Sequence, residues 1–311
     1  MTDFILLILS LFIVVKSAQF AVRYSSRIGR SFQITEYIIG FLVVAVISIL
    51  PEAFISIISA LKGVPEFGLS VLFGSNVADL ALVFAIVVLA SRHKGLRVQS
   101  SVLKESSFFL YLLALPIALG LNGYYSRLDG FILVSAGIFF YLRLLRNDHK
   151  FLAGNRGLRP PQNFSNFVFL LISLGVMLFG AYLTVRFGNS LARVIAINPA
   201  FIGLLFVGLS TTMPELFFSL RASRVRHDEL ALGDILGTVI SDAVIVVGVM
   251  ALIHPFDFNP RIVYVTGIFM LLAGLILFRF MKTGRLITKR EGVALLAFYL
   301  IFIIVEYIFN H

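Results

Sequence analysis

The 311-residue sequence has no cysteine, no tryptophan and few charged residues. The absence of cysteine excludes disulfide bonds, thiolate metal sites and a cysteine nucleophile. Charged residues make up 14% of the chain, whereas soluble domains carry about 25%. Hydrophobic residues reach 59%, and the mean hydropathy is +0.99. Because so few charges cannot cover a surface that faces water, the composition predicts an integral membrane protein.

Ten apolar stretches are candidates for transmembrane helices, since a helix needs about 20 apolar residues to cross the hydrocarbon core. The runs are long and continuous, which favours helices over the alternating strands of an outer-membrane barrel. The first run lacks a positive leading region and a cleavage site, so we expect a retained helix rather than a signal peptide. The stretches cover roughly 3–22, 33–60, 67–90, 106–121, 128–145, 165–185, 195–220, 229–253, 262–280 and 291–309.

Most basic residues fall on one side of these ten predicted spans. Of the 26 Lys and Arg residues, 20 lie at or beside the connections that follow odd-numbered spans. Because Lys and Arg concentrate in cytoplasmic loops, we expect odd-numbered loops in the cytoplasm and both termini outside. The formal charge of +10 therefore indicates the topology of a multi-pass protein of the cell membrane, and not a nucleic-acid partner.

The longest polar connection, residues 146–165, contains Gly, Asn and a Pro pair, which is typical of a linker. It divides the chain into a first five-helix repeat (1–145), a cytoplasmic linker (146–164) and a second five-helix repeat (165–311). The two halves align without a gap at an offset of 163 residues, over 48–83 and 211–246. The offset pairs Pro51 with Pro214, Glu52 with Glu215, Gly74 with Gly237, and Asp79 with Asp242.

An odd number of spans in each half makes the second half enter the membrane from the opposite face. The sequence therefore predicts an all-α integral membrane protein of ten transmembrane helices, arranged as two inverted-topology five-helix repeats. Many secondary transporters have this architecture, and their sites lie near the midplane, where broken helices meet. Gly74 and Gly237 are expected to let the third and eighth spans approach closely.

Four carboxylates lie well inside apolar spans: Glu52, Asp79, Glu215 and Asp242. A charge near the bilayer centre costs at least about 2.5–3.5 kcal/mol. No Lys or Arg lies at a matching depth in these segments, so we expect the missing partner to be a bound cation or a proton. A proline precedes each Glu, and proline breaks or kinks a helix, which at this depth is tolerated only inside protein or beside a cavity.

The candidate ligands are all oxygen atoms, because hydroxyl groups accompany the carboxylates. A hydroxyl lies four residues before each acid and therefore on the same helix face. Hard cations such as Ca²⁺ take about six to eight oxygen ligands, and the lack of Cys and His disfavours zinc and copper. The candidate hydroxyl ligands are Ser48, Ser75, Thr211, Thr212 and Thr238.

These elements resemble the cation/calcium exchanger superfamily. That family carries two inverted repeats, each with a Gly-Thr-Ser-Leu-Pro-Glu-like helix followed by a Gly-Ser-Asn-x-x-Asn-like helix. The first element reads VISILPE at 46–52 and GLSTTMPE at 208–215, and the second reads GSNVAD at 74–79 and GTVISD at 237–242. The resemblance extends over the ten-helix layout with both termini outside.

The resemblance implies that Glu52 and Glu215 bind Ca²⁺ directly. It also implies that further residues complete the Ca²⁺ and Na⁺ sites: Asp79, Asp242, Ser48, Thr211, Thr212, Ser75 and Thr238, with backbone carbonyls at Ala45 and Gly208. The sequence departs from the family at Ile49, where the first repeat usually has a second hydroxyl, and in carrying Asp in both repeats. Because burial and like charges disfavour ionised carboxylates, an Asp is expected to be protonated in some states.

The resemblance implies a secondary active antiporter that exports calcium in exchange for sodium by alternating access, with helices 1 and 6 as the moving part. The alternative is a proton/calcium antiporter with Asp79 and Asp242 as proton carriers. Neither form needs a cofactor, and the expected partners are Ca²⁺, Na⁺ or H⁺ and the lipid bilayer, with no nucleic acid and no obligate protein partner.

Other function classes fit the residues less well. An intramembrane aspartyl protease would use Asp79 and Asp242 but leave Glu52, Glu215 and the prolines unexplained. A passive cation channel would use a similar oxygen set, and the chain has no ATP-binding motif for a primary pump. The sequence therefore favours a transporter over an enzyme. Of two further acids, Asp234 is expected to line an ion entrance or to cap a helix, and Glu306 to reach outward to the interface.

Overall fold

The computed structural model describes residues 2–29, 41, 45–91, 95–98, 100–146, 164–194, 202–224 and 226–310. In this part of the chain the first half is helical apart from two short strands. Its elements are α1 (Thr2–Gly29), α3 (Ala45–Ser48), α4 (Leu50–Leu61), α5 (Pro65–Val77), the π-helix η2 (Ala78–Val83), α6 (Phe84–Ala90), β1 (Gly95–Arg97), α7 (Ser100–Lys104), α8 (Ser106–Leu119), the 3₁₀ turn η3 (Gly120–Asn122), β2 (Tyr124–Tyr125) and α9 (Arg127–Arg146).

The second half has a closely similar order of elements. They are α11 (Phe164–Val194), the π-helix η4 (Gly203–Val207), α13 (Gly208–Thr211), α14 (Met213–Arg224), α15 (Asp228–Ile240), the π-helix η5 (Ser241–Val246), α16 (Val247–Ile253), β3 (Phe256–Asp257), the π-helix η6 (Val263–Gly267), α17 (Ile268–Lys282), β4 (Leu286–Thr288) and α18 (Lys289–Asn310).

Within the described residues, six helices are long and apolar enough to cross a membrane: Pro65–Ala90, Arg127–Arg146, Leu171–Gly188, Asp228–Ile253, Val263–Lys282 and Lys289–Ile308. Each coincides with a predicted span. The predicted span 106–121 falls on a shorter apolar helix, Ser106–Asn122, and the span 3–22 lies within α1. The predicted spans 33–60 and 195–220 and the linker lie partly or largely outside the described residues. The ten-span count therefore stays a prediction.

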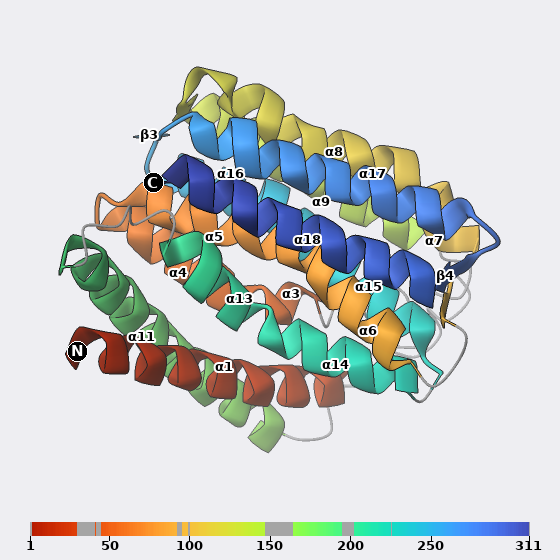
Figure 1. Ribbon diagram of the computed structural model, residues 1–311. Helices are drawn as coiled ribbons and strands as arrows, with labels where there is room; N and C mark the ends of the chain where they lie inside the picture. The colour runs from red at the N-terminus through yellow and green to blue at the C-terminus, as the bar shows by residue number, and fades with distance from the viewer. Residues whose placement is uncertain are drawn as a thin grey trace.

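Two long helices form the buried centre of the protein. They are the continuous segments α5–η2–α6 and α15–η5–α16, in whose most apolar stretches 89% and 83% of the residues are buried. They run in opposite directions (Figure 1). Near the start of α5, Glu66 accepts a hydrogen bond from the backbone N–H of Asn259 at 2.7 Å. At the start of α15, Asp228 accepts one from the N–H of Arg97 at 3.0 Å. Each helix thus begins beside the segment that follows the other.

Two small antiparallel sheets also join the halves. Strand β1 pairs with β4, with Gly95 opposite Thr288, and strand β2 pairs with β3, with Tyr125 opposite Phe256. Since β1 and β2 belong to the first half and β3 and β4 to the second, each sheet ties one half to the other.

Contacts inside the bundle repeat at the 163-residue offset found in the sequence. Ser56 Oγ donates to the Gly68 carbonyl at 3.0 Å, and Ser219 Oγ donates to the Ala231 carbonyl at 3.3 Å. The π-helices η2 and η5 also start and end at equivalent positions. These paired features are what two halves built on one plan would produce.

The two glycines at equivalent positions pack tightly, but not against each other's helices as the sequence suggested: each contacts a different segment of the other half. A Cβ on Gly74 would lie 3.0 Å from the Leu204 side chain, and a Cβ on Gly237 would lie 2.7 Å from the Phe41 carbonyl oxygen. The positions 41 and 204 are themselves related by the offset. The lack of a side chain therefore sets how closely α5 approaches η4 and how closely α15 approaches Phe41 and α3.

The helices α1 and α11 pack against each other beside the main bundle (Figure 1). Thr184 Oγ1 donates to Ser10 Oγ at 3.1 Å, and the Val14 side chain fills the space in front of Gly180. Their buried side chains belong to a second apolar cluster, separate from the main core and shared with parts of α4 and α5.

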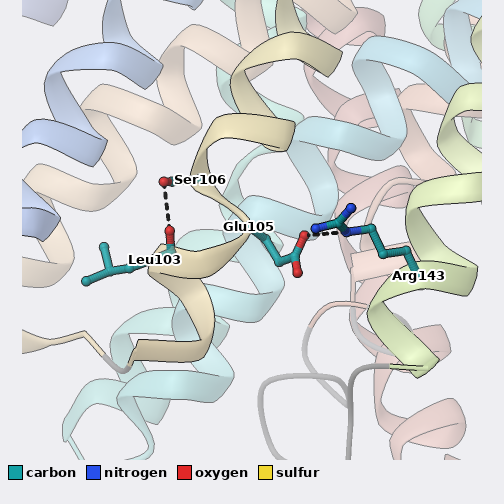
Figure 2. Close-up of polar contacts among 4 residues, drawn as sticks. All are labelled: Leu103, Glu105, Ser106 and Arg143. Carbon is teal, nitrogen blue, oxygen red and sulfur yellow. Dashed lines mark hydrogen bonds and ion pairs between the residues drawn. The ribbon is translucent and has the colours of Figure 1, made fainter.

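The outer helices are joined by polar contacts at their ends. Glu105, at the turn between α7 and α8, accepts a hydrogen bond from Arg143 Nε of α9 at 3.0 Å (Figure 2). The Arg143 guanidinium also lies over the Phe108 ring.

The prediction that Glu306 reaches outward is wrong: it is 3% exposed and accepts a hydrogen bond from Thr266 Oγ1. A hydroxyl on the neighbouring η6 satisfies this acid inside the bundle.

Candidate cation-binding site

Two helix breaks place the paired glutamates. The helix α3 ends at Ser48, and α4 starts at Leu50 after the single turn residue Ile49. In the second half α13 ends at Thr211, and α14 starts at Met213 after Thr212. Both breaks lie two residues before a proline, whose missing N–H and bulky ring disfavour a continuous helix.

Each glutamate then falls in the first turn of the new helix, Glu52 in α4 and Glu215 in α14. The N-terminal turn of a helix presents backbone N–H groups and the positive end of its dipole, which favours an ionised acid. The residues after the breaks rejoin the helical hydrogen-bond pattern, with Ala53 N–H on the Ile49 carbonyl at 2.8 Å and Leu216 N–H on the Thr212 carbonyl at 3.0 Å.

The two aspartates lie in π-helices. Asp79 is the second residue of η2, and Asp242 is the second residue of η5. A π-helix widens one turn by an extra residue, and such turns occur frequently at functional sites. The sequence pattern gave no signal of these π-helices. Their position beside the two acids is the main feature that sequence reasoning missed.

All four carboxylates are fully buried, and none of their oxygen atoms has a hydrogen-bond partner among the described residues. Burial of a charged or polar group without a partner is costly. The Arg143–Glu105 ion pair involves none of these four acids. The interior therefore holds eight oxygen atoms in need of a positive charge or a proton.

The acids of the two halves face one interior region. Glu52 lies within electrostatic reach of Glu215, Asp79 and Asp242. Hydroxyls reach across between the halves, because Thr211 lies beside Glu52 and Ser75 lies beside Asp242. Each of these hydroxyls is thus placed next to an acid of the other half, an arrangement that spacing along one helix does not predict.

The candidate hydroxyls of Ser75, Thr211 and Thr212 keep lone pairs available for a cation. Ser75 donates its proton to the Leu72 carbonyl at 3.1 Å, Thr211 to the Val207 carbonyl at 3.1 Å, and Thr212 to the Leu209 carbonyl at 2.9 Å. A hydroxyl that donates its proton to its own helix retains two lone pairs. The Thr238 hydroxyl lies 3.5 Å from that of Ser48.

The two candidate carbonyl ligands are occupied within their helices. The Ala45 carbonyl accepts from Ile49 N–H at 3.0 Å and from Ser48 Oγ at 3.3 Å. The Gly208 carbonyl accepts from Thr212 N–H at 3.2 Å and from Thr211 Oγ1 at 3.0 Å. A carbonyl oxygen has two lone pairs, so these two atoms become ligands only if one of these bonds is released.

In the described residues no group of three His, Asp or Glu side chains is tight enough to hold a metal ion. The four acids thus share one interior region without forming a closed cage in this conformation. Asp234 is an additional acid of the same region, fully buried and hydrogen-bonded to Ser48. Since it lies in the middle of α15, the expectation that it caps a helix is wrong.

The chain combines broken helices, a buried cluster of oxygen ligands and several helices long and apolar enough to cross a membrane. These features together are typical of multi-pass membrane transporters. A family model described as sodium/calcium exchanger protein matches residues 2–145 and 165–308. The chain belongs to this family, as the sequence resemblance implied. The match leaves out residues 146–164, the segment predicted to be the linker.

Individual relatives agree with the family. The sodium/calcium exchanger MaX1 of Methanosarcina acetivorans is 24% identical, over 97% of this chain and 98% of its own. The putative antiporter CaxA of Alkalimonas amylolytica is 27% identical, over 81% of each. A solved structure of the sodium-calcium exchanger NCX_Mj is similar with a TM-score of 0.71 and 24% identity, covering 96% of each chain. The structural likeness shows the fold, and the names of the relatives indicate cation/calcium antiport and describe no enzyme.

Proposed function

We propose that the protein is a secondary antiporter that exports Ca²⁺ in exchange for Na⁺. The observation that carries the proposal is the set of eight carboxylate oxygens, from both halves, that are buried without a partner. A transported cation supplies the missing charge. Ca²⁺ suits the site because it takes oxygen ligands in flexible geometry, and this cluster offers carboxylates and hydroxyls only.

The proposed ligand set centres on Glu52 and Glu215, which begin the two helices after the breaks. The other members are Asp79, Asp242, Ser48, Ser75, Thr211, Thr212, Thr238 and the carbonyls of Ala45 and Gly208. Among the described residues the acids do not lie close enough together to coordinate one ion, so cation binding is expected to bring their carboxylates closer. Such a contraction couples ion binding to a change of conformation.

The proposed architecture is the ten-helix inverted repeat of 1–145 and 165–311, with both termini outside and odd-numbered loops in the cytoplasm. The repeated contacts and the opposed directions of α5 and α15 support it. Alternating access would come from sliding of α1 and α11 past the rest of the bundle. Their separate apolar cluster supports this, because apolar packing without many fixed polar contacts is suited to shear motion.

Transport into proteoliposomes tests the proposal. Vesicles loaded with Na⁺ and diluted into Na⁺-free buffer should take up ⁴⁵Ca²⁺, and Glu52→Gln and Glu215→Gln should each abolish uptake. Glu66→Gln is the matched control, since Glu66 accepts a backbone hydrogen bond at the start of α5, away from the buried cluster. Loss of uptake in all three variants would point to misfolding, and uptake that survives in both cluster variants would contradict the proposed site.

A second arm carries an acid-inside pH gradient without Na⁺. The two aspartates in equivalent π-helices favour keeping proton coupling as the alternative, with Asp79 and Asp242 as carriers. Uptake driven by this gradient alone, and lost in Asp79→Asn or Asp242→Asn, would establish proton/calcium exchange. Uptake driven by Na⁺ alone would reject it.

A further inference from the structure

A fifth carboxylate, Asp234, lies next to the proposed site but is engaged differently from the other four. It is fully buried in the middle of α15. Its Oδ1 accepts a hydrogen bond from Ser48 Oγ at 3.2 Å, and its Oδ2 accepts one from Ser219 Oγ at 3.2 Å. Each carboxylate oxygen thus lies within hydrogen-bond distance of a serine hydroxyl, whose single proton it shares with a backbone carbonyl.

The two hydroxyls come from the two broken helices. Ser48 is the last residue of α3, four residues before Glu52, and Ser219 lies on α14, four residues after Glu215. Asp234 therefore bridges the segment before one paired glutamate and the helix that carries the other. A single side chain on α15 joins both halves at the edge of the unpartnered carboxylates.

This bridge has no equivalent in the first half. Ser56 makes the same hydrogen bond to Gly68 that Ser219 makes to Ala231, but the position equivalent to Asp234 is Val71. The packing of one broken helix on its neighbour is thus achieved in the first half without a carboxylate. Repeat packing alone does not explain a buried acid at position 234.

The bond to Ser48 has a chemical consequence. A hydroxyl has one proton, and the Ser48 proton has two acceptors, Asp234 Oδ1 at 3.2 Å and the Ala45 carbonyl at 3.3 Å. With its proton held there, Ser48 Oγ offers only lone pairs to a cation. A carboxylate acceptor also makes the hydroxyl oxygen more electron-rich, as outer partners of metal ligands generally do.

We propose that Asp234 is a positioning residue of the cation site, which fixes Ser48 as a ligand with its oxygen toward the ion and so raises the affinity for Ca²⁺. The inference rests on the proposed function, because it assigns a partner to one of the ligands proposed there. It makes the site asymmetric: the ligand before Glu52 is held by a carboxylate of the other half, and its counterpart Thr211 is held by backbone carbonyls of its own helix.

The test measures Ca²⁺ dependence of Na⁺-driven ⁴⁵Ca²⁺ uptake in proteoliposomes. Asp234→Val, which installs the residue of the first half, should raise the half-saturating Ca²⁺ concentration by about 10- to 100-fold, the usual effect of losing an outer partner of a metal ligand. The maximal rate should change much less than the half-saturating concentration, because the ligands themselves remain. A purely structural role would lower the maximal rate and leave the half-saturating concentration unchanged.

Two further variants keep the proposal falsifiable if Asp234→Val folds poorly. Asp234→Asn should retain most of the Ca²⁺ affinity, because the amide oxygen can still accept the hydrogen bond from Ser48. The amide N–H₂ can then donate to Ser219 Oγ, since Ser219 donates its own proton to the Ala231 carbonyl. Ser48→Ala should weaken Ca²⁺ affinity, and the loss should not add to that of Asp234→Val. Ser56→Ala is the matched control, because it removes the repeat-equivalent packing bond in the half without the bridge.

The outcomes separate this inference from the proposed function. Wild-type vesicles without exchange would overturn the proposed function, and exchange that survives in both Glu52→Gln and Glu215→Gln would overturn the proposed site; the inference falls with either result. Normal wild-type exchange with an unchanged half-saturating concentration in Asp234→Val would overturn the inference alone. Fully additive effects of Asp234→Val and Ser48→Ala would overturn it as well, because the two residues would then act independently.

Discussion

The hydroxyl of Tyr141 in α9 is hydrogen-bonded to the hydroxyl of Ser241, the residue directly before Asp242. Ser241 Oγ donates its own proton to the Gly237 carbonyl at 2.7 Å, so Tyr141 must be the donor. The bond connects an outer helix to the π-helix that carries one of the buried acids. It has no repeat equivalent, because Ala78 and Ile304 occupy the corresponding positions.

This bond predicts a modest effect of Tyr141→Phe. Removing one buried donor while the Ser241 proton keeps its acceptor should lower the free energy of unfolding by about 0.5–1.5 kcal/mol. The ring packing against Phe41 is retained in the variant. The thermal midpoint of the purified protein in detergent measures the change.

The matched control is Tyr111→Phe, since the Tyr111 side chain is 73% exposed on α8. That variant should leave the midpoint unchanged. Equal shifts in both variants would show that the bond between Tyr141 and Ser241 contributes nothing specific to stability.

The unpartnered carboxylates predict an unusual response to Glu52→Gln. Replacing a fully buried acid by a neutral amide removes a desolvated charge, so the cation-free protein should become more stable. At the same time the variant should lose the stabilisation by Ca²⁺ that the proposed site predicts for the wild type, about 2.7 kcal/mol at a free concentration 100 times the Kd. Thermal midpoints with chelator and with Ca²⁺ measure both effects.

The opposite pattern would contradict the site. A Glu52→Gln variant that is less stable without cation, yet still stabilised by Ca²⁺, would mean that the acid has a structural partner and that the ion binds elsewhere. Glu66→Gln provides the reference, because Glu66 already holds a hydrogen bond from Asn259 N–H at 2.7 Å.

The sequence predicted most features that depend on strong local chemistry. Glu52 and Asp79 stand out because charged residues in apolar spans are rare, and Pro51 marks the helix break because proline cannot donate a hydrogen bond. The internal offset also predicted which positions correspond. These signals are carried by single residues and do not depend on tertiary packing.

Other features could not be predicted, because they depend on packing between the halves. The π-helices around Asp79 and Asp242 have no residue signature, since the extra residue is set by how neighbouring helices fit. Spacing along one helix places Ser75 with Asp79, whereas the fold sets it beside Asp242. Glu306 was expected to reach the interface because no sequence rule places Thr266, 40 residues earlier, at its carboxylate.

The close approach at Gly237 predicts a large effect of Gly237→Ala. A Cβ there would lie 2.6 Å from the Ala45 Cβ and 2.7 Å from the Phe41 carbonyl oxygen, so α15 and the segment around α3 must move apart. Overpacking of this kind costs about 1–3 kcal/mol. Since Ser48 and Thr238 meet across the same contact, exchange activity should fall together with the thermal midpoint.

A glycine in open surroundings provides the control for this substitution. Nothing lies within 4 Å of a Cβ on Gly175 in α11, and alanine is favoured over glycine in a helix by up to about 1 kcal/mol. Gly175→Ala should therefore keep or raise the midpoint and leave exchange intact. A similar loss in both variants would argue against a close contact at Gly237.

The distribution of basic residues predicts the orientation of the chain in the membrane, and the lack of cysteine makes the test clean. Single cysteines at Leu121 and Thr283, two exposed positions in turns after α8 and α17, should lie on opposite sides. A membrane-impermeant maleimide applied to intact cells should label Leu121→Cys and not Thr283→Cys, and permeabilised cells should show both. Reversed labelling would mean that the chain has the opposite orientation, with the 20 basic residues at odd-numbered connections outside the cell, and would contradict the prediction. Labelling of both positions in intact cells would contradict an odd number of crossings between them, and with it the inverted arrangement of the two halves.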